Sequence, residues 1–171
     1  MKTLFTEEEI AARIDAMAEE IVAALPKDAL LAPILTGAFV FAADLARGLA
    51  RKNATYEIDF MHLSSYGGAR ASTGVVKLLK DLTVDVKDRT VLLIDDVLDT
   101  GGSLFFARRL LLERRVADVK VCVLVDKKTG RADDINADFI GFEAPADAFL
   151  VGYGMDDKGQ WRGFPYIGTA E

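Results

Sequence analysis

Apolar residues in this chain follow two spacings, one typical of amphipathic helices and the other of buried strands. From residue 7 onward they recur every three or four positions, which predicts a helix with a single apolar stripe: Ile10, Ile14, Met17, Ile21 and Leu25. Thr6 followed by Glu9 is a capping box, so this helix should begin there and end before Pro26. The chain is therefore expected to open with an amphipathic helix.

Short, continuous apolar runs follow this helix and alternate with further helical patterns. They predict strands at 30–35, 56–63, 75–80, 91–94, 119–125, 139–142 and 149–153, and helices at 38–51 and 104–112. Such an alternation is typical of a mostly parallel sheet with helices on both faces. We therefore expect an α/β fold in one domain, residues 1–171. Ligands of such sheets bind beyond the carboxyl ends of the strands.

The most informative stretch spans residues 90–104 and reads Thr-Val-Leu-Leu-Ile-Asp-Asp-Val-Leu-Asp-Thr-Gly-Gly-Ser-Leu. A buried strand, a glycine turn and a helix start together form a phosphate cradle, because the first N–H groups of the helix point at the anion. Three carboxylates, Asp95, Asp96 and Asp99, would repel a bare phosphate. The ligand should therefore also offer sugar hydroxyls or a metal ion, which carboxylates bind.

Composition narrows the class of protein. With 171 residues, of which 51% are hydrophobic and 28% charged, the chain can bury a core and does not resemble a disordered protein. A net charge of −6 argues against a nucleic-acid-binding surface. Residues 1–13 lack the apolar segment of a signal peptide, and no apolar run is long enough to span a bilayer. We therefore expect a cytoplasmic protein with neither nucleic-acid nor membrane partners.

Residues 94–103 resemble the phosphoribosyl pyrophosphate signature of the type I phosphoribosyltransferases. Flanking blocks, within about residues 30–168, resemble the hypoxanthine (hypoxanthine-guanine) branch of that family. The resemblance implies a mostly parallel sheet, with a small hood built from the chain termini, mainly residues 127–171, over the strand ends. It also implies transfer of 5-phosphoribosyl from phosphoribosyl pyrophosphate to hypoxanthine and guanine, with Mg²⁺ as cofactor. Relatives of this kind form homodimers or homotetramers.

The resemblance assigns roles to the central stretch. Asp95 and Asp96 match the acidic pair that holds the ribose diol and neighbours Mg²⁺, although the family usually has Glu before Asp. Asp99 matches the catalytic acid near N7 of the purine. The residues matching the loop for the 5′-phosphate are Thr100, Gly101, Gly102 and Ser103.

Further matches lie outside that stretch. Residues expected to contact pyrophosphate are Thr36, Gly37, Ser65, Tyr66 and Arg162, the first standing where the family carries Lys or Arg. Ser65 and Tyr66 open a glycine-rich segment, about residues 64–75, that matches the family's flexible loop. For the purine, the matches are Lys127 at the 6-oxo group, Phe149 stacking on the ring, Leu150 reading its edge, and Asp156, which also matches a ligand of the second Mg²⁺.

Three alternatives remain open at this level. The first is a related enzyme that prefers xanthine and guanine. The second is a non-catalytic, RNA-binding regulator on the same scaffold, which would need a basic face that the net charge of −6 does not suggest. The third is a signalling receiver domain, whose sheet also ends in an acidic pair. In that class the pair lies near the start of the domain, and the turn at residues 100–103 has no counterpart.

Overall fold

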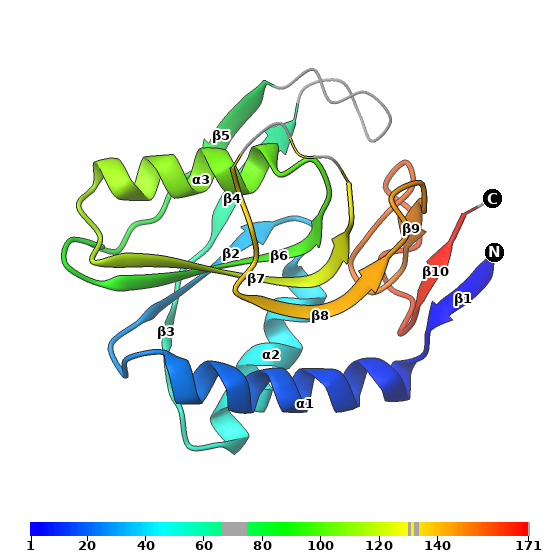
Figure 1. Cartoon of the computed structure of the whole chain (residues 1–171), viewed down its shortest axis with the longest axis horizontal. Coiled ribbons are helices and arrows are strands. Elements are labelled where there is room, and N and C mark those ends of the chain that lie inside the picture. The colour runs from blue at the N-terminus through cyan, green and yellow to red at the C-terminus, as the bar shows by residue number, and fades with distance from the viewer. Residues whose placement is uncertain (66–74, 130, 132–133, 171) are drawn as a thin grey trace.

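A computed structural model describes residues 1–65, 75–129, 131 and 134–170, and its centre is a seven-stranded sheet (Figure 1). The strand order is β5-β4-β2-β6-β7-β8, with the short β3 also paired to β2. All pairings are parallel except that of β5 with β4. The predicted α/β fold with a mostly parallel sheet is confirmed. The strands are β2 (Leu30–Leu35), β3 (Glu57–Ile58), β4 (Met61–Ser65), β5 (Val76–Lys80), β6 (Thr90–Leu98), β7 (Asp118–Lys127) and β8 (Phe139–Ala144).

Helices cover both faces of the sheet. Helices α1 (Glu7–Ala24) and α2 (Phe39–Arg51) pack on one face, and α3 (Gly102–Glu113) packs on the other (Figure 1). Successive residues of β2 point to opposite faces, so Leu31 joins the core under α1 and α2 while Leu30 joins the core under α3. This two-sided burial explains why the strands read as continuous apolar runs.

The first helix begins where the capping box predicts. The backbone N–H of Thr6 donates to the Glu9 carboxylate at 2.8 Å, and the N–H of Glu9 donates to the Thr6 hydroxyl at 3.2 Å. The predicted apolar stripe is buried, with Ile10, Ile14, Met17 and Ile21 at most 2% exposed. Among the described residues, no helix combines the length and apolar character needed to cross a membrane.

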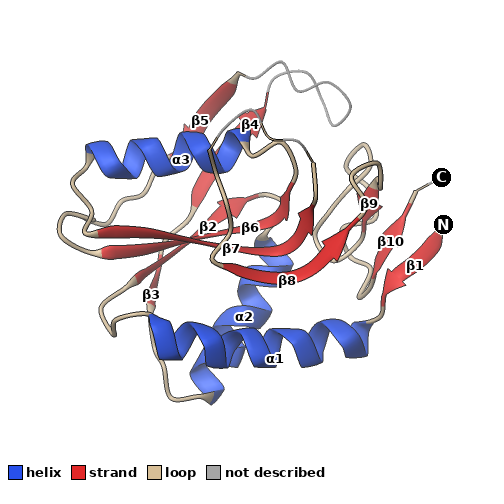
Figure 2. Ribbon diagram, viewed as in Figure 1, coloured by secondary structure: helices blue, strands red, loops and turns tan. Residues whose placement is uncertain are grey.

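A second, small sheet lies beyond the carboxyl ends of the main strands (Figure 2). It is antiparallel, in the order β1-β10-β9, and joins the two ends of the chain: β1 (Lys2–Phe5), β9 (Leu150–Val151) and β10 (Ile167–Thr169). We call this sheet, with the chain from 149 to 170, the hood. The apolar pattern does not predict β1 and β10, because strands of three or four residues are too short to show a periodicity.

Two strands differ from their predicted limits in ways that affect the carboxyl edge of the sheet or divide the strand, while the others shift by at most three residues at either end. The apolar run ends at Ile94, but β6 continues to Leu98. Its pairing with β2 stops at Ile94, whereas its pairing with β7 continues to Leu98. At Asp95 and Asp96, the edge of β6 that faces β2 is therefore not paired with a strand. The strand predicted at 56–63 is instead two short strands, β3 and β4, interrupted where the N–H of Asp59 donates to the carbonyl of Leu31 at 3.0 Å.

Candidate active site

The predicted site residues gather at the carboxyl edge of the sheet. The Thr36–Gly37 turn follows β2, the aspartate pair lies in the last part of β6, and Lys127 ends β7. Because these strands are adjacent and parallel, their carboxyl ends deliver the side chains to one edge. Ser65 is the last residue of β4, and Val76 of β5 lies opposite it. Tyr66 and most of the predicted flexible segment lie outside the described residues.

Asp95 and Asp96 form a half-buried acidic pair. The N–H of Asp96 donates to Asp95 Oδ1 at 3.0 Å, and the N–H of Val97 donates to Asp96 Oδ1 at 2.8 Å. Burial first, and then the neighbouring Asp96 carboxylate, raise the pKa of Asp95 well above its usual range. Burial also raises the pKa of Asp96, although the Arg162 charge works in the opposite direction. A pair of this kind is stabilised by hydroxyl donors or by a cation.

The donor set fits Mg²⁺ held jointly with a substrate. Carboxylate oxygens are the ligands that this ion takes, and it is commonly bound by one or two carboxylates together with substrate phosphates and water. The part of the chain that the structure describes contains no group of three or more Asp, Glu, His or Cys side chains able to hold a metal alone. Oxygens of a bound ligand would therefore complete the coordination sphere.

The loop after β6 has the geometry of a phosphate cradle. Gly101 takes a left-handed conformation, with φ 87°, and immediately precedes α3. A Cβ at Gly101 would meet Cγ2 of Ile135 at 2.3 Å, so both the conformation and the space require glycine. A cavity of about 120 Å³ opens above this turn, lined by Asp95, Val97, Asp99, Thr100, Gly101, Gly102, Ser103 and Leu104. Two of the predicted acids, Asp95 and Asp99, thus share one cavity with the predicted cradle, whereas Asp96 does not line it.

Asp99, the residue after β6, lies beside Lys127, the last residue of β7. Lys127 Nζ lies 2.9 Å from Asp99 Oδ2, and its side chain is only 12% exposed. The carbonyl of Asp99 accepts hydrogen bonds from the Thr129 hydroxyl at 2.7 Å and from Arg131 Nε at 3.3 Å. The acid proposed for the purine and the lysine proposed for its 6-oxo group therefore lie side by side.

Arg131 is a site-supporting residue that sequence analysis missed. Besides the Asp99 carbonyl, its guanidinium pairs with the carboxylate of Asp126, which is 3% exposed. A buried carboxylate needs such a partner, since isolated buried charge is strongly unfavourable. No local pattern marks Arg131, because its contact with Asp99 spans 32 residues of sequence.

The turn after β2 is held between β6 and the hood. A Cβ at Gly37 would lie 2.0 Å from Asp96 Oδ2, and a Cβ at Gly154 would lie 2.3 Å from the Gly37 carbonyl oxygen. The Leu35–Thr36 peptide bond is cis. Arg162 donates to the Gly154 carbonyl at 2.6 Å and forms an ion pair with Asp156 at 2.8 Å. The structure thus brings the predicted pyrophosphate residues of β2 and of the hood to one place.

The predicted purine residues Phe149 and Leu150 belong to the hood sheet. Leu150 lies in β9 opposite Thr169 of β10, and the carbonyl of Phe149 accepts from the N–H of Ala170 at 3.0 Å. Asp156 lies further along the hood, where it also accepts from the N–H of Gly159 at 2.6 Å. Pairing with the carboxyl-terminal segment positions Phe149 and Leu150, whereas Asp156 is held by Gly159 and Arg162.

Comparison with known proteins identifies the class to which this arrangement belongs. The family model for the phosphoribosyl transferase domain matches residues 1–158. The hypoxanthine-guanine phosphoribosyltransferase of Bacillus subtilis is 42% identical over 170 residues, covering 98% of this chain and 92% of the relative. The hypoxanthine phosphoribosyltransferase of Escherichia coli is 37% identical over 171 residues, with coverage of 98% and 94%.

Comparison with solved structures points to the same class of protein as the sequence relatives. A hypoxanthine phosphoribosyltransferase of Staphylococcus aureus superposes with a TM-score of 0.90 at 35% identity, covering 100% of this chain and 91% of that one. One from Trypanosoma cruzi gives a TM-score of 0.90 at 34% identity, with the same coverage. The chain belongs to the hypoxanthine (hypoxanthine-guanine) phosphoribosyltransferases within the phosphoribosyl transferase domain family.

These findings confirm the predicted family and enzyme class, a glycosyltransferase of purine salvage. The receiver-domain alternative is wrong, because the matched family is a different one. The RNA-binding regulator and the xanthine-preferring enzyme gain no support from relatives whose names specify hypoxanthine.

Proposed function

We propose that this protein transfers the 5-phosphoribosyl group of phosphoribosyl pyrophosphate to N9 of hypoxanthine or guanine, forming IMP or GMP and releasing pyrophosphate. The bond from the anomeric carbon to pyrophosphate breaks, a bond to N9 forms, and the purine loses one proton. The observation that carries the proposal is the 2.9 Å pair of Lys127 and Asp99 beside the phosphate cavity, which joins a purine-reading group to a ribosyl-phosphate site.

The donor's ribosyl phosphate would occupy the cavity at the end of β6. Its 5′-phosphate would accept hydrogen bonds from the N–H groups at the start of α3, where the helix dipole also favours an anion. Its two ring hydroxyls would donate to Asp95 and Asp96, whose neighbouring carboxylates otherwise repel each other. These contacts fix the sugar while positive charge develops at the anomeric carbon.

Pyrophosphate would lie against the Thr36–Gly37 turn. The close approach of Gly37 to Asp96 and Gly154 leaves backbone groups and the Thr36 hydroxyl as its contacts from β2. Arg162, 28% exposed, would supply the positive charge that Thr36 does not. Ser65 and Tyr66 are proposed to complete this subsite and to exclude water, which would otherwise hydrolyse the cationic sugar.

Mg²⁺, when bound, would neutralise the leaving pyrophosphate. Asp95 and Asp96 would hold it near the ribose, and Asp156 would hold a second ion near the pyrophosphate. The Asp156 carboxylate pairs with Arg162 and accepts a hydrogen bond from the N–H of Gly159.

The purine would be read by three elements. Lys127 would donate a hydrogen bond to the 6-oxo group. Adenine carries a 6-amino group there, which cannot accept this bond, so kcat/KM for hypoxanthine should exceed that for adenine by a factor on the order of 10⁴. Phe149 would stack on the ring and the backbone of Leu150 would contact its edge. Asp99 would accept the proton from N7 as N9 attacks, a general-base role for which its position beside Lys127 suits it.

We further propose that the protein is cytoplasmic and forms a homodimer or homotetramer. The absence of a membrane-spanning helix among the described residues is compatible with the first part. For the second, the related Trypanosoma cruzi enzyme was studied for the role of its C-terminal region in oligomeric state and enzymatic activity.

The direct test is pyrophosphate release by the purified protein with phosphoribosyl pyrophosphate and Mg²⁺. We expect rapid release with hypoxanthine or guanine and none above background with adenine or uracil. Equal rates with every base, or release only with xanthine, would contradict the proposed substrate class.

A further inference from the structure

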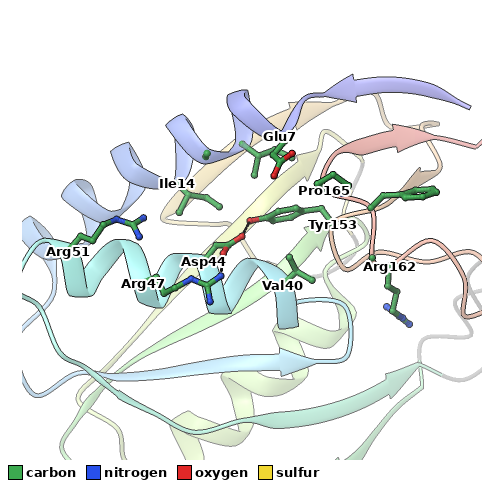
Figure 3. A pocket seen from close by; sticks show the side chains of 13 residues that line it. Glu7, Ile14, Val40, Asp44, Arg47, Arg51, Tyr153, Arg162 and Pro165 are labelled. Carbon is green, nitrogen blue, oxygen red and sulfur yellow. Dashed lines mark hydrogen bonds and ion pairs between the residues drawn. The ribbon is translucent and has the colours of Figure 1, made fainter.

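A partly buried hydrogen bond connects the hood to α2 through two residues that have no role in the site described above. The Tyr153 hydroxyl donates to the carboxylate of Asp44, and Arg47 pairs with the other oxygen of the same carboxylate (Figure 3). Tyr153 is 5% exposed. Burial first, and then Asp44, raise the pKa of the Tyr153 phenol, so it remains a hydrogen-bond donor at neutral pH.

The backbone around Tyr153 forms a tight and fully bonded turn. Gly152, Tyr153 and Gly154 have φ values of 93°, 51° and 99°, the left-handed region in each case. The N–H of Tyr153 donates to the carbonyl of Phe164 at 2.8 Å, and the N–H of Gly154 donates to the carbonyl of Arg162 at 2.8 Å. A left-handed tyrosine is unfavourable unless its surroundings fix it. The bond to Asp44 is one such constraint.

This turn contacts the Thr36–Gly37 loop, which also contacts Asp96. Gly154 approaches the Gly37 carbonyl so closely that a Cβ would lie 2.3 Å from the oxygen. Helix α2 begins directly after the loop, and the N–H of Phe39 donates back to the Thr36 carbonyl at 3.1 Å. Asp44 therefore lies on α2, the helix that follows the loop, while Gly154, the residue after Tyr153, contacts the loop itself. One hydrogen bond connects the two.

We propose that Tyr153 and Asp44 are positioning residues that hold the hood turn on the Thr36–Gly37 loop and thereby set the affinity for ligands that carry pyrophosphate. This rests on the proposed function, which places pyrophosphate at that loop. The purine residues are anchored separately, since Leu150 pairs with Thr169 in the hood sheet. Loss of the Tyr153–Asp44 bond should therefore weaken pyrophosphate binding selectively.

The test compares two ligands that differ in pyrophosphate. Calorimetry would measure Kd for phosphoribosyl pyrophosphate with Mg²⁺ and for IMP, using wild type, Tyr153→Phe, Asp44→Ala and the double variant. Each single variant should raise Kd for the pyrophosphate ligand about 10-fold, as expected for loss of a hydrogen bond to a charged group, and Kd for IMP less than twofold. The double variant should be no weaker than the worse single, because both remove the same bond.

Two further variants separate positioning from a general loss of stability. Asp44→Asn keeps an acceptor for the hydroxyl, so its Kd should lie closer to wild type than that of Asp44→Ala. Tyr166→Phe removes a hydroxyl from the hood ring that stacks on Phe164, and should leave both affinities unchanged. Thermal unfolding would establish that each variant is folded under the conditions of the titration.

The outcomes are distinct. Equal weakening of both ligands, or no change in either, would overturn the positioning role while leaving the proposed function intact. If wild-type protein bound neither ligand, the proposed function would fail and this inference with it.

Discussion

The backbone of Gly37 lies directly against the carboxylate of Asp96, so closely that a Cβ would meet Oδ2 at 2.0 Å. The turn after β2 and the acidic pair of β6 are therefore in contact before any ligand binds. In the proposed function this contact joins the pyrophosphate subsite to the ribose subsite. The identity of a single glycine then controls the geometry of both.

Gly37→Ala tests this contact. The added methyl must displace Asp96 or the turn, and we expect KM for phosphoribosyl pyrophosphate to rise at least ~10-fold, as for loss of a hydrogen bond to a charged group. Gly163→Ala is the matched control, since a Cβ at Gly163 meets nothing within 4 Å. Steady-state kinetics of both variants provide the measurement. Wild-type KM in Gly37→Ala would show that the contact is dispensable.

Lys127→Ala tests the purine subsite. Removing the ammonium takes away the donor proposed for the 6-oxo group, so the preference for hypoxanthine over adenine should fall by at least ~100-fold from a starting value on the order of 10⁴. The ratio of kcat/KM for the two bases measures this directly. Lys128→Ala is the control, because Lys128 instead pairs with Glu143 at 2.9 Å. An unaltered ratio in Lys127→Ala would remove Lys127 from the base pocket.

Asp99→Asn tests the proposed proton acceptor. The amide keeps the shape of the side chain but is a far weaker base, so kcat should fall about 10²-fold or more while KM for the ribosyl donor changes little. Single-turnover rates at saturating donor would separate chemistry from product release. A variant with wild-type kcat would exclude Asp99 from the chemical step.

Asp59 makes a pH-dependent contribution to stability. Burial alone would raise its pKa, but hydrogen bonds from the backbone of Thr83, Val84 and Phe60 outweigh this and lower it from 3.8 to about 2. Because the folded-state pKa is depressed, the stabilisation is complete above about pH 4 and is lost as pH falls toward 2.

Asp59→Asn should therefore lower the free energy of unfolding by about 1–3 kcal/mol at pH 7, because the amide replaces a charged acceptor and can accept at only one of its two positions. The difference from wild type should shrink as pH falls from 4 to 2. Urea unfolding at several pH values gives both quantities, and the exposed Asp147→Asn is the control. A difference that stays constant with pH would contradict the assignment.

Local patterns predicted the elements that carry their own signals. The capping box at Thr6 and the stripe from Ile10 to Ile21 gave the position of α1, and the glycine turn at residues 100–103 correctly anticipated the start of α3 nearby. Both rest on interactions between residues only a few positions apart. The end of β6 was missed because Asp95 and Asp96 interrupt the apolar run, although β7 continues to pair with the strand.

Contacts between distant residues could not be predicted. The Tyr153–Asp44 bond spans 109 residues, and the Lys127–Asp99 pair spans 28. No local sequence pattern marks either contact. The edge of a sheet brings together residues whose distance along the sequence depends on the length of the intervening helices and loops. The resemblance to a known family supplied the roles of Lys127 and Asp99, whereas Tyr153, Asp44 and Arg131 belonged to no predicted site.

The central claim is that the acids of β6 and the following loop bind a phosphorylated ribose. Calorimetric titration of wild type and of the Asp95→Asn/Asp96→Asn double variant with phosphoribosyl pyrophosphate and Mg²⁺ tests it most directly. We predict one site per chain in wild type and an affinity at least ~100-fold weaker in the double variant, since two charged hydrogen-bond acceptors are lost. Equal affinity in the two proteins, or no binding to wild type, would contradict the claim.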